Sequence, residues 1–132
     1  MQVPALIYEA MVTHARFSLP DEACGLLASD SDGRLRMCYC LTNADRSPTV
    51  YTINPVEHFR ALQHAERNGW ALSGAFHSHT RSAPVPSVTD RRRAYERDWV
   101  YFIVGPVESP DVGRRGYRIR DGVPTEVPLT VV

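Results

Sequence analysis

The sequence has no surplus of charge of either sign. Its Lys and Arg residues total 15, its Asp and Glu residues also total 15, and the formal net charge is zero with neutral histidines. Proteins that hold nucleic acid through its phosphates need a basic surface, because phosphate charge dominates that affinity. The even balance therefore argues against a nucleic-acid partner.

Long apolar runs are also missing. A transmembrane helix needs about 18 or more consecutive apolar residues, and no segment approaches this length. The N-terminal segment contains Glu9 and His14, and it lacks the charged start and unbroken apolar stretch of a signal peptide. We therefore expect a soluble, cytoplasmic protein with no membrane partner.

Cysteine is scarce, at three residues in 132. Cys38 and Cys40 are two apart in a predicted strand and so share a face, while Cys24 lies in another apolar segment. We expect all three thiols to be buried or half-buried apolar side chains, as suits a reducing compartment. A Cys-x-Cys metal clip is the alternative, but no second cysteine pair is present to complete a four-thiolate site.

The chain also lacks repeats, low-complexity tracts and linkers, so we expect one domain covering residues 1–132. At this length one core is enough without disulfide or metal staples. Apolar spacing, capping residues and helix breakers predict three helices. They are expected between Pro4 and Pro20, from the Asn54 cap and Pro55 to about Asn68, and from about Ser87 toward Arg97.

Apolar runs bounded by turn residues predict the strands. These cover residues 22–29, 34–42, 50–53, 70–79, 99–105, 114–122 and 125–132. We expect the first two to form a hairpin, the strongly apolar 99–105 to lie centrally, and Asp121-Gly122 to turn between the last two. Helices and strands alternate without a strict repeat, which predicts a mixed α/β sheet flanked by helices.

Two histidines end one of these strands. His77 and His79 are two residues apart, so their rings leave the same face with Cα atoms roughly 6.5 to 7 Å apart. Ser87 and Asp90 follow, three apart in a predicted helix and hence on one helix face. Two imidazoles and a carboxylate leave the fourth position of a tetrahedral zinc ion open for water, as a catalytic site requires. A His-x-His pair alone more often marks a polar strand end, so the wider pattern decides.

The wider pattern has five positions: Glu22, the two histidines, and then Ser87 and Asp90 after a span of seven residues. This arrangement resembles the motif of the JAMM (MPN-plus) metalloprotease family. The resemblance covers essentially the whole chain and implies a cytidine-deaminase-like mixed sheet flanked by helices. It also implies one zinc ion per chain, held by His77, His79 and Asp90, with Glu22 as general base and Ser87 as donor to the oxyanion.

Two of these roles have plainer alternatives. Glu22 could be a solvated acid at a strand end, and Ser87 could serve only as a helix N-cap, which is worth about 1 kcal/mol. Because Ser87 is three residues from Asp90 and follows the loop prolines, we expect it to lie at the metal. Loss of one oxyanion donor costs on the order of 100- to 1,000-fold in rate.

The segments DEACGLL, TNADRSPTVY and FHSHT are similar to a short bacterial branch of the family that acts on sulfur-carrier proteins. This resemblance implies a peptidase that cuts after the C-terminal Gly-Gly of a small ubiquitin-like sulfur carrier and releases cysteine or a short extension, in cysteine biosynthesis. An isopeptidase that removes a ubiquitin-like modifier from lysine is one alternative. A non-catalytic scaffold of the same fold is another.

Two arginines are candidate substrate-binding residues. We expect Arg81 or Arg46 to pair with the free carboxylate of a C-terminal cysteine, because a guanidinium fork suits a carboxylate. Pro84 and Pro86 stiffen the loop between the histidines and Ser87.

Other reactive side chains are given plainer roles. The Arg91–Arg93 run is expected to be a solvated helix face rather than a steering patch for an acidic carrier. His14, His58 and His64 are expected at the surface or half-buried, away from the motif. Cys24 as a second nucleophile is a minor alternative.

Overall fold

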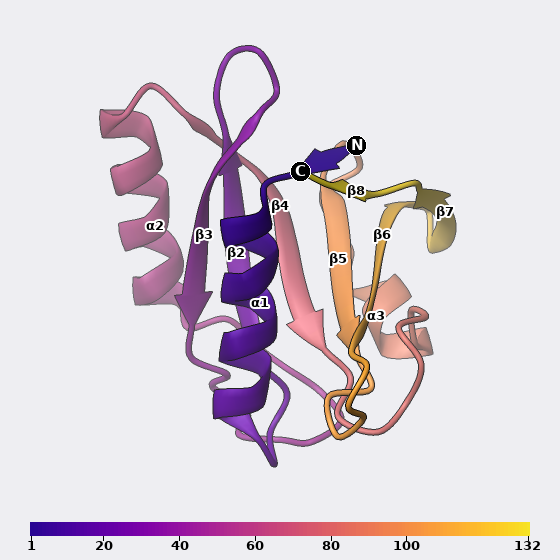
Figure 1. Ribbon diagram of the computed structural model, residues 1–132. Helices are drawn as coiled ribbons and strands as arrows, with labels where there is room; N and C mark the ends of the chain where they lie inside the picture. The colour runs from indigo at the N-terminus through magenta and orange to yellow at the C-terminus, as the bar shows by residue number, and fades with distance from the viewer.

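A six-stranded mixed sheet forms the centre of the computed structural model, which describes residues 1–132 (Figure 1). The spatial order is β3-β2-β4-β5-β6-β7, and only β4 and β5 are parallel neighbours. These strands are β2 (Cys24–Ser29), β3 (Leu35–Leu41), β4 (Ala71–Ser78), β5 (Val100–Gly105), β6 (Gly113–Arg120) and β7 (Val123–Val127). The predicted fold class, the hairpin of the first two strands and the central place of β5 are confirmed.

Helices cover both faces of this sheet. Helix α1 (Ala5–Ser18) lies in front of the strands in Figure 1, and α2 (Pro55–Arg67) packs against β2 and β4. One core cluster joins α1 to Leu27, Phe76 and Phe102. The other joins α2 to Leu26, Ala75 and Tyr101, which precede those residues in the same strands and point to the opposite face. Because successive strand residues point to opposite faces, the central strands must be apolar on both, which explains the unbroken apolar run of β5.

The helix boundaries follow the expected capping residues for the first two helices. The Asn54 side chain accepts hydrogen bonds from the backbone N–H groups of Val56 and Glu57, at 2.9 and 3.2 Å. The Glu57 carboxylate makes no hydrogen bond to the Asn54 backbone. It accepts instead from the backbone N–H of Thr42, at 2.8 Å. This bond ties the start of α2 to the end of β3.

Residues 50–53 do not form the predicted strand. Their one ladder contact is an isolated bridge between Asn43 and Ile53. The Asn43 side chain takes the place of a strand partner, since it donates to the carbonyl of Val50 at 2.9 Å and accepts from the N–H of Thr52 at 3.2 Å. The backbone groups of this segment are therefore satisfied in a loop.

Two other boundaries differ from expectation. Helix α3 (Val88–Arg92) is shorter than predicted, because the N–H of Glu96 bonds to the Tyr101 hydroxyl and not to a helical carbonyl. The segment 125–132 divides at Pro128, which cannot donate to a ladder. Its end forms β8 (Thr130–Val131), which pairs with β1 (Gln2–Val3) in a separate two-stranded sheet.

The cysteines are all free, and one departs from expectation. Cys24 is buried and Cys38 half-buried, as predicted, but Cys40 is exposed. Cys40 lies near the end of the edge strand β3, where its Sγ reaches the Ala10 carbonyl of α1 at 3.9 Å and the residue stays exposed. None of the helices combines the length and apolarity that crossing a membrane requires.

Substituting Gly25 should test the packing of β2 between its neighbours. A Cβ at Gly25 would collide with the Tyr39 carbonyl and the Phe76 ring. We expect Gly25→Ala to lower the free energy of unfolding by about 3 kcal/mol or more, the upper end of overpacking costs. Gly33→Ala is the control, because its Cβ meets nothing within 4 Å and only the positive φ of 79° opposes it, at about 1 kcal/mol. Equal urea midpoints for the two variants would contradict this account.

Candidate metal centre

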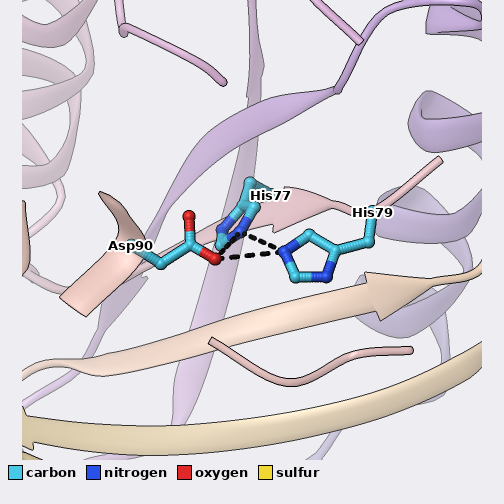
Figure 2. Close-up of side chains that lie close together, drawn as sticks. All are labelled: His77, His79 and Asp90. Carbon is cyan, nitrogen blue, oxygen red and sulfur yellow. Dashed lines mark hydrogen bonds and ion pairs between the residues drawn. The ribbon is translucent and has the colours of Figure 1, made fainter. Parts of the chain in front are cut away.

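The end of β4 delivers two buried imidazoles to one point. The Nε2 atoms of His77 and His79 lie 3.2 Å apart (Figure 2). The backbone N–H of His79 donates to the Val104 carbonyl at 2.9 Å, which extends the β4–β5 pairing past the strand end. The His79 ring is fixed from the other side, where Nδ1 lies 2.8 Å from the Ala83 carbonyl. Because a carbonyl oxygen only accepts, Nδ1 must carry a hydrogen, so in the neutral ring Nε2 is the nitrogen that can bind a metal ion.

Asp90 completes the cluster from α3. Its Oδ2 lies 3.1 Å from Nε2 of His77 and 3.0 Å from Nε2 of His79. The short helix that carries Asp90 is held by a capping box with Ser87. Ser87 N–H donates to Asp90 Oδ2 at 2.9 Å, and Asp90 N–H donates to Ser87 Oγ at 3.0 Å. The structure thus brings the three predicted ligands together, with Ser87 beside them.

The donor set fits a metal ion. The ligand atoms of His77, His79 and Asp90 all lie within 4.8 Å of one another. Neutral imidazole nitrogens and a carboxylate oxygen are the ligands of zinc and related transition metals. The His79–Ala83 bond is also the kind of outer contact that orients metal-binding histidines. Their role as ligands stays a prediction, and the arrangement is what that role requires.

The ionisation of the cluster reflects burial and mutual contact. Burial would raise the pKa of Asp90, but hydrogen bonds with the two imidazoles hold it well below its usual range. Burial lowers the pKa of His77, and Asp90 only partly offsets this. Asp90 is therefore ionised and His77 is biased toward the neutral form, as a metal ion needs in its ligands. Burial opposes a charge on His79, but hydrogen bonds with Asp90 and the Ala83 carbonyl outweigh it and raise the His79 pKa, so a metal ion would have to displace that proton.

Glu22 faces the same site from a position two residues before β2. It is 4% exposed, and its Oε1 is buried without a hydrogen-bond partner. The reading of Glu22 as a solvated strand-end acid is therefore wrong. Burial raises its pKa to about 8, and a nearby cation would favour the ionised form. An unpaired buried carboxylate oxygen is costly unless a ligand or ion meets it.

The backbone around Glu22 is locked in place. Its N–H donates to the Ser47 carbonyl at 2.8 Å, and its own carbonyl accepts from the Asn43 side chain at 3.1 Å. The N–H of the next residue, Ala23, donates to the Oγ of Ser78 at the end of β4, at 2.8 Å. The Ser78 N–H donates in return to the Ala23 carbonyl at 3.1 Å. The carboxylate and the histidines are thus held by one stretch of strand pairing.

A cavity of about 420 Å³ is lined by Glu22 together with one member of the cluster, His79. His79, Ser87 and Arg81 also contribute to its walls. Arg46 does not contribute, since it occupies an exposed turn at a positive φ of 44°. The structure therefore places Arg81, but not Arg46, in the space beside Glu22.

The remaining candidates lie elsewhere. His14 and His64 are half-buried and bond to the Leu41 carbonyl and the Tyr39 hydroxyl, while His58 is exposed. Cys24 is fully buried, and burial raises its pKa to about 12. A thiol that stays protonated at neutral pH has little nucleophilic power, which argues against the minor alternative.

The sequence motifs did not reveal Tyr51. Its ring stacks on the His77 ring, with centroids 4.7 Å apart and an angle of 22°. The Tyr51 carbonyl accepts from Arg93 at 2.9 Å, which connects this loop to α3, the helix of Asp90. One member of the Arg91–Arg93 run is therefore structural. One signal could have pointed to Tyr51: it is an aromatic residue in a loop whose backbone hydrogen-bonds to the Asn43 side chain.

A family model describing prokaryotic homologs of the JAB domain matches residues 4–119. The chain belongs to this family. Among its relatives, the CysO-cysteine peptidase of Mycobacterium tuberculosis (strain ATCC 25618 / H37Rv) is 38% identical over 131 residues, covering 98% of this chain and 90% of the relative. The desampylase of Haloferax volcanii is also 38% identical, over 104 residues that cover 74% of this chain and 75% of the relative.

Solved structures share the fold of this chain. The solution structure of a protein from Desulfitobacterium hafniense superposes with a TM-score of 0.90 at 32% identity, covering 100% of this chain and 93% of that one. A JAB1/MPN domain protein from Archaeoglobus fulgidus has a TM-score of 0.66 at 20% identity over 100% of this chain and 99% of its own, a likeness of fold alone.

Tyr51 generates a prediction about metal affinity. We expect Tyr51→Ala to weaken zinc binding roughly 10- to 100-fold, the usual effect of removing an outer contact of a ligand. Tyr51→Phe should change it less than about threefold, because the ring that stacks on His77 is kept. Competition with a chromophoric chelator measures both values. Tyr95→Ala, at a side chain 81% exposed, is the control, and equal losses in the Phe and Ala variants would contradict the stacking role.

Proposed function

We propose that this JAB-domain protein is a zinc-dependent peptidase that cuts after the C-terminal Gly-Gly of a small ubiquitin-like sulfur carrier. The product would be cysteine or a short C-terminal extension, which places the reaction in cytoplasmic cysteine biosynthesis. The observation that carries this proposal is the convergence of His77, His79 and Asp90 beside the unpaired buried Glu22. Near-complete coverage of a relative named CysO-cysteine peptidase supports the substrate class.

His77, His79 and Asp90 would hold the ion. A bound zinc ion supplies Lewis-acid chemistry, since it acidifies water and polarises a carbonyl. The donor set is rigid, because β4 pairing, the Ala83 carbonyl and the capping box each fix one of the side chains. Rigid donors need no rearrangement during the reaction, which is the condition for strong electrostatic stabilisation.

Glu22 would move the proton. Its Oε1 has no partner within the protein, so it is free to accept a proton from the attacking water and return it to the leaving amine. Burial raises its pKa, and a bound cation would oppose this shift and keep the carboxylate ionised, as a base must be. The leaving amine would depart as a neutral group.

Ser87 would serve two roles with one hydroxyl. Its oxygen accepts the Asp90 N–H as a helix cap, and this leaves the hydroxyl hydrogen free to donate. Ser87 also lines the cavity that Glu22 and His79 share. The cap and the oxyanion donor, weighed above as alternatives, are therefore compatible.

An isopeptidase acting on a ubiquitin-like conjugate is the second candidate. Two relatives support it by their names, the desampylase of Haloferax volcanii and the probable TtuB-protein conjugate cleaving protease of Thermus thermophilus. The Thermus protein is 30% identical over 95 residues. The two candidates share the cluster and differ in the leaving group. The complete five-residue set disfavours a non-catalytic scaffold.

The reaction can be tested with a carrier ending in Gly-Gly-Cys. We expect the protein to remove the mass of one cysteine residue, and a chelator or His77→Ala to abolish the cleavage. Glu22→Gln should bind zinc normally and lose roughly 100- to 10,000-fold in turnover, because an amide cannot take the proton. His58→Ala, at an exposed histidine, is the control. Mass spectrometry follows the product and the zinc content, and absence of zinc uptake would refute the proposal.

Ser87 can be tested separately from Glu22. Ser87→Ala should lose about 1 kcal/mol of stability and roughly 100- to 1,000-fold in turnover. Ser87→Thr should keep both, because a threonine hydroxyl accepts and donates in the same way. Asn54→Ala removes the cap of α2 instead, and should cost similar stability with turnover intact. Turnover within tenfold of wild type in Ser87→Ala would reduce Ser87 to a cap alone.

A further inference from the structure

The cavity beside Glu22 is rich in negative charge and has one permanent cation. Glu22 and Glu108 are both among its lining residues, and Arg81 is the only lysine or arginine among them. A substrate that ends in a free carboxylate beside Glu108 would be repelled by that acid unless a cation met it. Arg81 is the side chain available for that purpose.

The backbone just before Arg81 is held by three hydrogen bonds. Thr80, the residue before it, donates its hydroxyl to the Pro48 carbonyl at 3.2 Å and accepts the Glu108 N–H at 3.2 Å. The carbonyl of His79 accepts the Val107 N–H at 3.0 Å. Arg81 therefore projects from a fixed point only two residues beyond a candidate metal ligand.

The head of Arg81, in contrast, is loosely held. Its Nε lies 3.3 Å from Glu108 Oε2, and the two side chains are 83% and 48% exposed. Exposed ion pairs of this kind contribute little to stability. The guanidinium can leave Glu108 for another carboxylate at small cost, and its planar fork can bind that carboxylate with two hydrogen bonds.

We propose that Arg81 binds the free α-carboxylate of the residue that the enzyme releases, and that Glu108 holds the guanidinium when the cavity is empty. This subsite rests on the peptidase function proposed above and narrows it to removal of a single C-terminal amino acid. A lysine within a protein conjugate has no free α-carboxylate at this position. The subsite therefore favours the carrier–cysteine substrate over an isopeptide.

Binding to the inert Glu22→Gln protein tests the subsite without relying on turnover. Two carriers are compared by calorimetry, one ending in Gly-Gly-Cys with a free carboxylate and one with a C-terminal carboxamide. We expect the carboxylate form to bind roughly 10- to 100-fold more tightly, as a charge-assisted pair predicts. Adding Arg81→Ala should reduce this ratio to about one and leave carboxamide binding unchanged.

Three further variants sharpen the assignment. Arg81→Lys should keep part of the preference, because it retains the charge and loses the fork. Glu108→Gln should tighten carboxylate binding about two- to fivefold by removing the competing acid. Arg46→Ala should keep the full preference. A ratio that survives Arg81→Ala, or that is lost in Arg46→Ala instead, would overturn the proposal.

The wild-type protein separates failure of the subsite from failure of the proposed function. Cleavage of both carriers with equal kcat/KM would overturn the subsite and leave the peptidase function standing. A binding preference that depends on Arg81, in a wild-type protein that cleaves neither carrier, would support the subsite and refute the peptidase function. Equal binding of the two carriers to Glu22→Gln overturns the subsite in either case.

Discussion

The antiparallel pairing of β2 with β4 is the constraint on which the site depends. Its register sets Cys24 opposite His77, and the exchange of bonds between Ala23 and Ser78 continues the contact to the strand ends. Glu22 is thereby brought to the histidines from a distant part of the sequence. A slip of one residue would turn every side chain of one strand to the other face and exchange the side chains of the two core clusters, so the packing of those clusters protects the alignment.

The loops at this end of the sheet are as firmly held as the strands. Asn43 binds the carbonyls of Glu22 and Val50, and Arg93 binds the carbonyl of Tyr51. The Tyr51 ring then closes the contact onto His77. Strand, loop and short helix support one another around the cluster, which is how a site of three side chains from different elements keeps its geometry in so small a protein.

Local periodicity explains what the sequence could predict. His77 with His79, and Ser87 with Asp90, are close in sequence, and strand and helix spacing alone bring each pair together. Glu22 came only from the family resemblance, because its place depends on a long-range register. Residues 50–53 differ from the predicted strand for another reason. Their apolar side chains suit a strand, but the Asn43 side chain satisfies their backbone in a loop. The stacking of Tyr51 on His77 depends on the same loop, so local periodicity does not predict it. The choice between Arg46 and Arg81 depends on which of them lines the cavity, and the sequence does not show this.

The one parallel pair of the six-stranded sheet, β4 and β5, also governs when the protein can become active. Asp90 lies in the crossover between these strands, and the His79 backbone is anchored by Val104 of β5. A growing chain that reaches only His79 already contains Glu22 and both histidines, yet it lacks Asp90, the third candidate ligand, and the strand that anchors the His79 backbone. Peptidase activity would therefore arise only after synthesis of the central strand, so a nascent or truncated chain would present no active hydrolase to the proteins around it.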